Sequence, residues 1–129
     1  MQKDIALVLL CGGTGKRFSK TLPKQFHKIN NLTILEVNLK TFISFSIFTY
    51  ITVVSSKKYI NKTKKICKKF FSDELTINIT QGGSTRQLSS KNGCKNLEKY
   101  KPKKILIHDV ARPFINKDLV TRLIKNTKK

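Results

Sequence analysis

An apolar run that leads directly into a glycine-rich, cationic loop constrains this chain more than any other stretch. All residues from Ile5 to Leu10 are apolar, which is typical of a strand in a parallel sheet covered on both faces. The loop that follows holds three glycines, Gly12, Gly13 and Gly15, and several cations, among them Lys16, Arg17 and Lys24. Because glycine has no Cβ, the backbone can turn tightly there and approach a ligand closely. A strand that ends in such a loop predicts a phosphate-binding site.

The loop matches neither of two common phosphate-binding motifs. In the dinucleotide motif G-x-G-x-x-G, Gly13 and Gly15 fit, but Phe18 occupies the third glycine position. In the P-loop motif, Leu10 replaces the first glycine and Arg17 replaces the magnesium-binding hydroxyl residue. ATPase chemistry is therefore not expected. For the glycines alone, a plain strand-to-helix turn is an equal alternative.

Composition indicates one soluble domain with a strong positive charge. A chain of 129 residues is long enough for one modest core. Its 27 basic residues against 7 acidic residues give a net charge of +20, which favours anionic partners. Because 23 of the basic residues are lysines scattered along the chain, we interpret most of this charge as solvated surface. We expect no specific nucleic acid partner.

The cysteines and the apolar stretches indicate the compartment. Cys11, Cys67 and Cys94 form no C-x-x-C pair, which argues against a zinc site or a disulfide framework and suits a reducing environment. The first apolar run is too short for a signal peptide and lacks a small-residue cleavage site. No apolar stretch approaches membrane-spanning length. We therefore expect a cytoplasmic protein without a membrane partner.

Strand-like and helix-like segments alternate along the chain. Strands are predicted at residues 5–10, 50–55, 75–80 and 104–108, and helices from a capping box at 33–36, over about 60–71, over about 84–97 and after Asn116. Leu35, Leu39 and Phe42 share one face of the first helix, while Pro23 argues against helix in the loop over residues 11–26. The alternation predicts an α/β fold with a mainly parallel sheet and right-handed crossovers.

Ligands of such sheets bind beyond the carboxyl ends of the strands. Three informative segments are predicted there: the loop after the first strand, Gly82-Gly83 after the third, and Asp109 after the fourth. Their convergence on one edge supports a functional, phosphate-binding role more strongly than any single motif does. A lone aspartate at a strand end would otherwise be a turn or cap residue.

Five segments together carry a more specific pattern: residues 12–17, Pro-Lys-Gln-Phe at 23–26, residues 33–36, residues 82–86 with Ser89, and His-Asp-Val-Ala-Arg-Pro-Phe at 108–114. In this order and spacing they resemble the 2-C-methyl-D-erythritol 4-phosphate cytidylyltransferases, the IspD-like nucleotidyltransferases of isoprenoid precursor synthesis, over nearly the whole chain. The resemblance implies a Rossmann-like three-layer α/β/α fold of the nucleotide-diphospho-sugar transferase type. It implies one CTP-binding domain over residues 1–129, the N-terminal portion of the family.

The resemblance also implies a reaction and a set of roles. CMP would pass from CTP to 2-C-methyl-D-erythritol 4-phosphate, a sugar-alcohol phosphate, with release of pyrophosphate. Arg17 and Lys24 would be the catalytic cations on the triphosphate, Asp109 would bind Mg²⁺ and substrate, and Arg112 would bind substrate. The implied nucleotide-binding positions are Cys11, Gly12, Gly13, Thr14, Gly15, Lys16, Gly83, Ser84, Arg86 and Ser89.

Four polar residues in these segments have alternative roles. Ser84 and Ser89 could instead be helix-cap hydroxyls. Arg112 could tie down its own loop. His108 is expected to be a packed strand residue rather than a catalyst.

The chain departs from the family pattern in composition and in length. Cys11 and Gly12 stand where small apolar residues such as alanine are common, and Val110 replaces a usual alanine. Family members continue well past the last predicted helix into a half with further strands, more substrate-binding residues and a homodimer arm, so we expect a truncated or split gene product. The alternatives are a ribitol-5-phosphate cytidylyltransferase, which shares the Gly-Gly loop and Pro-Lys-Gln-Phe, and an inactive nucleotide-binding remnant.

Overall fold

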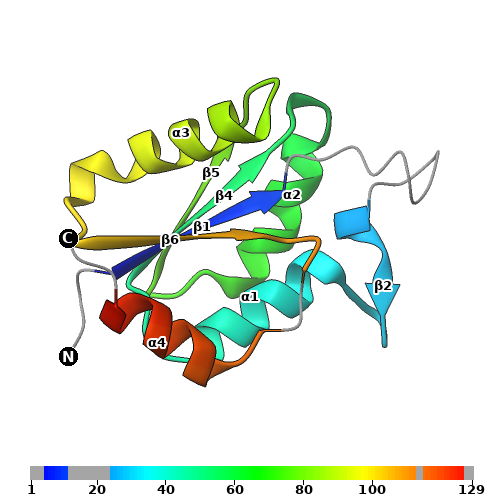
Figure 1. Cartoon of the computed structure of the whole chain (residues 1–129). Coiled ribbons are helices and arrows are strands. Elements are labelled where there is room, and N and C mark those ends of the chain that lie inside the picture. The colour runs from blue at the N-terminus through cyan, green and yellow to red at the C-terminus, as the bar shows by residue number, and fades with distance from the viewer. Residues whose placement is uncertain (1–4, 12–23, 113–114, 127–129) are drawn as a thin grey trace.

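The computed structural model describes residues 5–11, 24–112 and 115–126 (Figure 1). The strands in these ranges are β1 (Ile5–Cys11), β2 (Lys28–Ile29), β3 (Leu32–Thr33), β4 (Tyr50–Ser55), β5 (Thr76–Gln81) and β6 (Lys104–Asp109). The α-helices are α1 (Ile34–Ser44), α2 (Ile60–Cys67), α3 (Arg86–Leu97) and α4 (Lys117–Asn126). Short 3-10 helices complete the elements: η1 (Lys24–Phe26), η2 (Lys57–Tyr59), η3 (Lys68–Phe70) and η4 (Glu98–Tyr100).

The predicted parallel sheet is confirmed. β1 lies between β4 and β6, and β5 pairs with the outer side of β4, so the order is β5-β4-β1-β6 with every pair parallel. Figure 1 shows α3 above the sheet and α1 and α4 below it, and α2 shares the core on the α1 side. The result is a three-layer α/β/α arrangement. Within the described ranges, no helix is long and apolar enough to cross a membrane.

β1 is buried over its whole length, as its continuous apolar sequence predicts. Alternate side chains enter two separate core clusters. Those on the α1 and α2 side are Leu7, Leu9 and Cys11, and those on the α3 side are Ala6, Val8 and Leu10. The strand is therefore fixed by packing from both layers of helices.

Gly93 allows α3 to lie close against the sheet. A Cβ at this position would lie 2.6 Å from Val8 Cγ1 and 2.9 Å from Val54 Cγ2, well inside the optimal separation of carbon atoms. A glycine inside a helix costs about 1 kcal/mol relative to alanine, yet here the missing side chain permits the packing of the whole helix.

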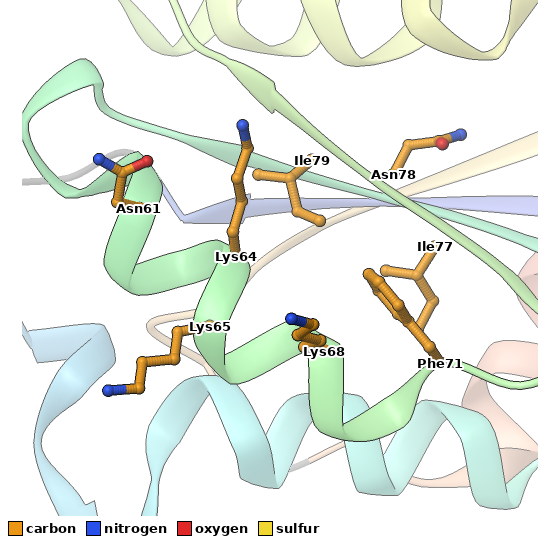
Figure 2. A pocket seen from close by; sticks show the side chains of 8 residues that line it. All are labelled: Asn61, Lys64, Lys65, Lys68, Phe71, Ile77, Asn78 and Ile79. Atoms are coloured by element: carbon orange, nitrogen blue, oxygen red, sulfur yellow. The ribbon is translucent and has the colours of Figure 1, made fainter.

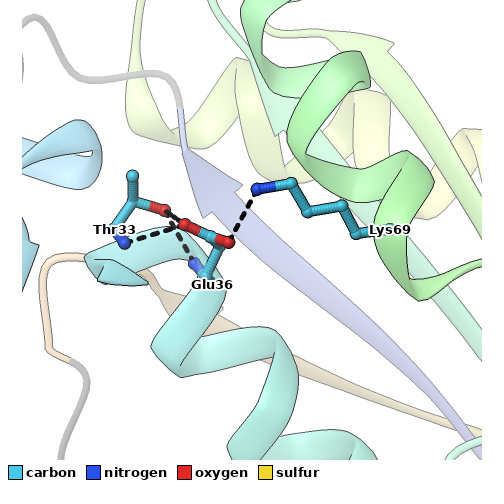
Figure 3. Close-up of polar contacts among 3 residues, drawn as sticks. All are labelled: Thr33, Glu36 and Lys69. Carbon is cyan, nitrogen blue, oxygen red and sulfur yellow. Dashed lines mark hydrogen bonds and ion pairs between the residues drawn. The ribbon is translucent and has the colours of Figure 1, made fainter. Parts of the chain in front are cut away.

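The predicted capping box at the start of α1 is confirmed. Thr33 Oγ1 accepts the Glu36 N–H at 3.1 Å, and Glu36 Oε1 accepts the Thr33 N–H at 2.9 Å. Glu36 Oε2 lies 3.1 Å from Lys69 Nζ, which ties the start of α1 to η3 (Figure 3). The predicted apolar face of the helix is also confirmed, because its members are fully buried: Leu35, Leu39 and Phe42.

A short hairpin that the sequence does not predict precedes α1. Asn30 and Asn31 adopt left-handed conformations, with φ of 52° and 70°, and form the two-residue turn between β2 and β3. Each of these strands has only two residues. Such short strands show no alternation of apolar and polar residues by which they could be predicted.

Two helix predictions are wrong in their bounds. The helix expected over about 60–71 ends as α2 at Cys67 and continues as η3, and Phe71 is 53% exposed. The expectation that Pro23 excludes helix from the following residues fails at Lys24–Phe26, which form η1. Proline restricts the residue before it and is favoured at helix starts. The predicted cap of the last helix is confirmed, since Asn116 Oδ1 accepts the Leu119 N–H at 2.8 Å.

Candidate functional site

The carboxyl ends of the four parallel strands meet at one edge of the sheet, which we call the carboxyl edge. Their last residues pair in register: Cys11 with Ser55, Ser55 with Gln81, and Leu10 with Asp109. The pairing continues past the strands, because the Gly82 N–H donates to the Ser55 carbonyl at 2.8 Å and the Val110 N–H to the Leu10 carbonyl at 3.1 Å. The end of β1, the Gly82-Gly83 turn and Asp109 therefore leave the sheet on the same side.

Gln25 and Phe26 anchor the segment that follows the glycine loop. Gln25 is 5% exposed, and its Nε2 donates to the Cys11 carbonyl at 3.1 Å. Phe26 is buried, and its ring lies against that of Tyr59 with centroids 5.4 Å apart. Lys24 immediately precedes these two anchors, so its backbone lies beside the end of β1.

The thiol of Cys11 points into the core and away from the carboxyl edge. The residue is 1% exposed and shares a core cluster with Cys67. Burial and the neighbouring Cys67 raise the pKa of the Cys11 thiol far above its ordinary value, so the thiol is protonated at neutral pH. Its carbonyl already accepts the Gln25 hydrogen bond. The part of Cys11 that lies at the carboxyl edge is thus its backbone.

The Gly82-Gly83 turn is held against the first turns of α3. Ser89 Oγ accepts the Gly83 N–H at 3.1 Å, while Thr85 Oγ1 caps the helix by accepting the Leu88 N–H at 3.1 Å. A Cβ on Gly82 would lie 2.6 Å from Ser89 Oγ, and one on Gly83 would lie 2.4 Å from Leu88 Cβ. Both glycines are required because the strand end and the helix approach each other so closely.

Three residues near this turn were predicted to bind the nucleotide. Ser84 and Arg86 are exposed beside it, whereas Ser89 is buried and bonded to Gly83. The alternative in which Ser84 or Ser89 caps α3 is wrong, because Thr85 is the cap. The Ser89 hydroxyl accepts one hydrogen bond and keeps its own proton for donation.

Asp109 ends β6 and shapes the turn that follows. Its Oδ1 accepts the Ala111 N–H at 2.9 Å, and its carbonyl accepts the Arg112 N–H at 3.0 Å. Among the described residues, no hydrogen bond involves Oδ2. One carboxylate oxygen thus orients the group within its own turn.

Asn38, a fully buried residue of α1, fixes the peptide after Asp109. Its Nδ2 donates to the carbonyls of Ile34 and Val110, both at 3.0 Å. The Val110 N–H is bonded to the Leu10 carbonyl. The polar groups of Val110 are therefore held by two different elements, β1 and α1, and this sets the direction in which Asp109 leaves the sheet.

His108 and Arg112 close the same turn. The His108 ring packs edge-on against Phe42 with centroids 5.1 Å apart, and its Nε2 donates to the Arg112 carbonyl. Burial lowers the pKa of His108 below its ordinary value, although the Arg112 carbonyl and Asp109 oppose this. The ring is therefore neutral at pH 7, and the prediction of a packed strand residue is confirmed. The Arg112 side chain is exposed, so it is the backbone of Arg112 that ties down the loop.

The carboxylate at the carboxyl edge has the chemistry that a Mg²⁺ ion requires of a ligand. Asp109 supplies a hard oxygen, the ligand type that Mg²⁺ prefers. In the part of the chain that the structure describes, no cluster of three or more His, Cys, Asp or Glu residues could hold a metal ion. Mg²⁺ is commonly bound by one or two carboxylates together with substrate phosphates, and the single carboxylate here suits that arrangement.

Part of the predicted site lies outside the described residues. This applies to Gly12, Gly13, Thr14, Gly15, Lys16, Arg17 and the side chain of Lys24. Gln25 and Asn38 are positioning residues that were not predicted from the sequence. Gln25 lies within the Pro-Lys-Gln-Phe segment, which was the available signal. For Asn38 the signal was a polar residue at a core-facing position of a helix whose neighbouring positions are apolar.

A cavity of about 530 Å³ lies between α2 and the edge strand β5 (Figure 2). Ile77, Ile79 and Phe71 give it an apolar side, and Lys64 and Lys68 line it from the helix. None of the residues predicted for the nucleotide site lines this cavity. The predicted residues that the structure describes lie at or next to the carboxyl edge instead.

Comparisons with known proteins agree with this geometry. The family profile described as IspD, 2-C-methyl-D-erythritol 4-phosphate cytidylyltransferase, matches residues 5–129. A protein of that name from Thermosipho africanus is 45% identical over 123 residues, which cover 94% of this chain and 53% of the relative. The structure of the bifunctional IspDF from Campylobacter jejuni matches with a TM-score of 0.73 and 31% identity, covering 96% of this chain and 30% of that one.

A further solved structure supports the fold alone. The 4-diphosphocytidyl-2C-methyl-D-erythritol synthase from Anaerococcus prevotii matches with a TM-score of 0.73 at 24% identity, covering 96% of this chain and 50% of that one. The chain spans about half the length of the curated relatives that it matches.

Proposed function

Since this chain belongs to the IspD family of 2-C-methyl-D-erythritol 4-phosphate cytidylyltransferases, we propose that it is the CTP-binding part of such an enzyme. The reaction moves CMP from CTP to 2-C-methyl-D-erythritol 4-phosphate and releases pyrophosphate. The substrate phosphate attacks the α-phosphorus of CTP, and negative charge increases on the α-phosphoryl oxygens and on the leaving group. Catalysis of such a step rests on positioning and on electrostatic stabilisation.

One observation supports this function above the others. Three segments that match the family pattern, which are far apart in sequence, converge on the carboxyl edge beside the end of β1: Lys24–Phe26, the Gly82-Gly83 turn and Asp109. In open α/β sheets, this is the edge at which ligands bind. The local hydrogen bonds of Gln25 and Asn38 then orient the segments that carry Lys24 and Asp109.

The proposed roles follow from charge and position. Arg17 and Lys24 stabilise the charge on the triphosphate and on departing pyrophosphate. Asp109 holds Mg²⁺, which when bound neutralises phosphate charge. The glycine loop provides backbone N–H groups for the nucleotide, the Gly82-Gly83 turn provides room for it, and Arg112 binds the acceptor.

Turnover by this chain is tested by pyrophosphate release. CTP and Mg²⁺ are supplied with 2-C-methyl-D-erythritol 4-phosphate in one arm and ribitol 5-phosphate in the other. We expect release with the erythritol phosphate and background release with the ribitol phosphate. The opposite preference would contradict the proposed acceptor. CTP binding without release in either arm would indicate a nucleotide-binding remnant.

Replacing Lys24 tests its role within the same assay. Lys24→Ala is expected to fold normally and to lose about 10²–10³ in rate, the usual effect of removing one preorganised donor. Lys40→Ala is the matched control, because Lys40 is an exposed lysine of α1, and its rate should stay within about twofold of the parent. Near-normal turnover in Lys24→Ala would contradict the assignment.

We further propose a cytoplasmic location and, for an assembly of full family length, a homodimer. The three cysteines are free thiols, which suits a reducing compartment. Light scattering on the purified protein, with and without CTP, measures the oligomeric state directly. A monomer at every concentration would show that this length of chain does not form the homodimer by itself.

A further inference from the structure

A second basic cavity lies beside the hairpin that precedes α1. It encloses about 530 Å³ between the β2–β3 hairpin on one side and α2 with η3 on the other. Four lysines line it: Lys28 from the hairpin, and Lys62, Lys65 and Lys69 from the helical side. We call this space the hairpin cavity. Lysines of two separate elements thus face one space.

The lysines of the helical side form one stripe. Residues three or four apart lie on the same face of a helix, so Lys62, Lys65 and Lys69 follow each other along α2 and η3. At a rise of about 1.5 Å per residue the stripe is about 10 Å long. Figure 2 shows Lys65 pointing away from Ile77 and Ile79, toward the opposite side of α2. Lys65 also lines the cavity beside β5, whereas Lys62 and Lys69 line the hairpin cavity and are not among the residues of the other cavity.

The charge in the hairpin cavity is barely compensated. Its one acidic lining residue is Glu36, and both oxygens of this carboxylate are engaged: Oε1 by Thr33 and Oε2 by Lys69 (Figure 3). Burial disfavours the charged form of Glu36, but the hydrogen bonds from Thr33 and Lys69 outweigh it, and its pKa lies below the ordinary value. Within the described residues, Lys28, Lys62 and Lys65 have no acidic partner.

The sequence around the hairpin cavity adds to its positive charge. Seven of the thirteen residues from 57 to 69 are lysines, and no acidic residue occurs from 37 to 72. Lys62 also lies over the Phe26 ring, 5.3 Å from its centroid, which holds one ammonium group at the cavity wall. Like charges along one helix face destabilise the helix slightly, and a bound polyanion would convert that repulsion into attraction.

We propose that the hairpin cavity binds a condensed phosphate, a di- or triphosphate group, in contact with Lys28, Lys62 and Lys65. The size of the group matches the stripe, because two or three linked phosphates span several of its lysines at once. Phe26 is buried and offers no free ring for a nucleobase, so the recognised part is the phosphate chain. The ligand is either free inorganic pyrophosphate or the phosphate chain of a nucleotide. This proposal does not depend on the proposed function.

Calorimetric titration with inorganic pyrophosphate and with tripolyphosphate tests the site. The cavity variant replaces Lys28, Lys62 and Lys65 by glutamine. Its charge-matched control replaces Lys91, Lys95 and Lys99, exposed residues of α3 and η4 on the other face of the sheet. Both variants lose three positive charges, and far-UV circular dichroism checks that both are folded. A single variant, Lys62→Gln, serves in place of the triple one if the latter does not fold, because Lys62 lines the hairpin cavity and not the cavity beside β5.

The cavity variant is expected to bind both phosphates about tenfold or more weakly, the loss of at least one charge-assisted hydrogen bond. The control should stay within about twofold of the parent, since distant exposed charges are screened by salt. Equal losses in the two variants would overturn the proposal. The proposal would also be overturned if the protein bound a single-stranded RNA but bound neither pyrophosphate nor tripolyphosphate.

Titration of the cavity variant with CTP shows whether the ligand is free condensed phosphate or the phosphate chain of a nucleotide. A loss of CTP affinity that matches the loss for pyrophosphate indicates the nucleotide's phosphate chain, and unchanged CTP affinity indicates free condensed phosphate. Asp109→Asn lies outside the cavity. If Asp109→Asn loses CTP binding but still binds pyrophosphate, the hairpin cavity and the proposed CTP site are two distinct sites.

Discussion

β1 and β6 are neighbouring parallel strands that both end at the candidate site, yet they are held in different ways. Every residue of β1 is buried between two layers of helices. In β6, Ile105 and Ile107 are each 37% exposed on the α3 side. The end of β1 is therefore positioned by packing, whereas the end of β6 depends on the hydrogen bonds of Val110, Asp109 and Asn38.

This difference separates stability from site geometry. Packing on β1 contributes to folding of the whole sheet, so its loss affects the protein globally. The hydrogen bonds at the end of β6 each involve few atoms and contribute modestly to folding. They direct the segment that carries Asp109, so their loss should affect ligand binding more than stability. Substitutions in the two strands can test this.

Truncating a side chain in each strand should give the largest contrast. Leu9→Ala in β1 is expected to lower the free energy of unfolding by about 2–5 kcal/mol, because it opens a cavity in a closed core. Ile107→Ala in β6 should lower it by about 1 kcal/mol, because the side chain is partly in water already. Urea denaturation measures both. Equal losses of unfolding free energy in the two variants would show that Ile107 is as well buried in solution as Leu9, which would contradict the difference between β6 and β1.

Removing the Asn38 amide should disturb the end of β6. Asn38→Leu leaves the Val110 carbonyl without its donor, at a cost of about 1–3 kcal/mol of stability, and should weaken Mg²⁺-dependent CTP binding. Thr52→Val is the matched control, because Thr52 also makes a side-chain hydrogen bond, to Asn96 at 3.0 Å, but lies within β4. Its stability should fall similarly while CTP binding is unchanged. Equal CTP affinity in the two variants would contradict the claim that hydrogen bonds at the end of β6 position the ligand site.

The capping box gives a smaller, pH-dependent effect on the helix that carries Asn38. The folded-state pKa of Glu36 lies below its ordinary value, so its contribution is present above the unfolded value of about 4.3 and is lost as pH falls through the folded value. Glu36→Gln is expected to cost about 1 kcal/mol at neutral pH. Its unfolding free energy should also fall less steeply than the parent's below about pH 5. Parallel pH profiles of the two proteins would refute this.

The sequence is sufficient to predict the sheet because packing dictates its pattern. The buried strands are continuous apolar or β-branched runs, and the capping box at Thr33 and Glu36 is a local signal that the structure confirms. The convergence of β1, the Gly82-Gly83 turn and Asp109 follows from the general geometry of parallel sheets.

Other features depend on contacts between distant residues and leave little local signal. The contact of Asn38 with Val110 spans 72 positions in sequence. The Gly93 packing depends on Val8 and Val54 of other elements. The direction of the Cys11 thiol depends on which face of β1 meets α2. The β2–β3 hairpin is too short for periodicity to reveal it.

Calorimetric titration of the protein with CTP, with and without Mg²⁺, tests the central claim that the carboxyl edge is a CTP site. We expect binding that strengthens with Mg²⁺ and that Asp109→Asn weakens by about tenfold or more, because the ion loses its charged protein ligand. Pyrophosphate binding at the hairpin cavity should be unaffected by this variant. CTP affinity that is insensitive to Mg²⁺ and equal in the parent and in Asp109→Asn would contradict the account.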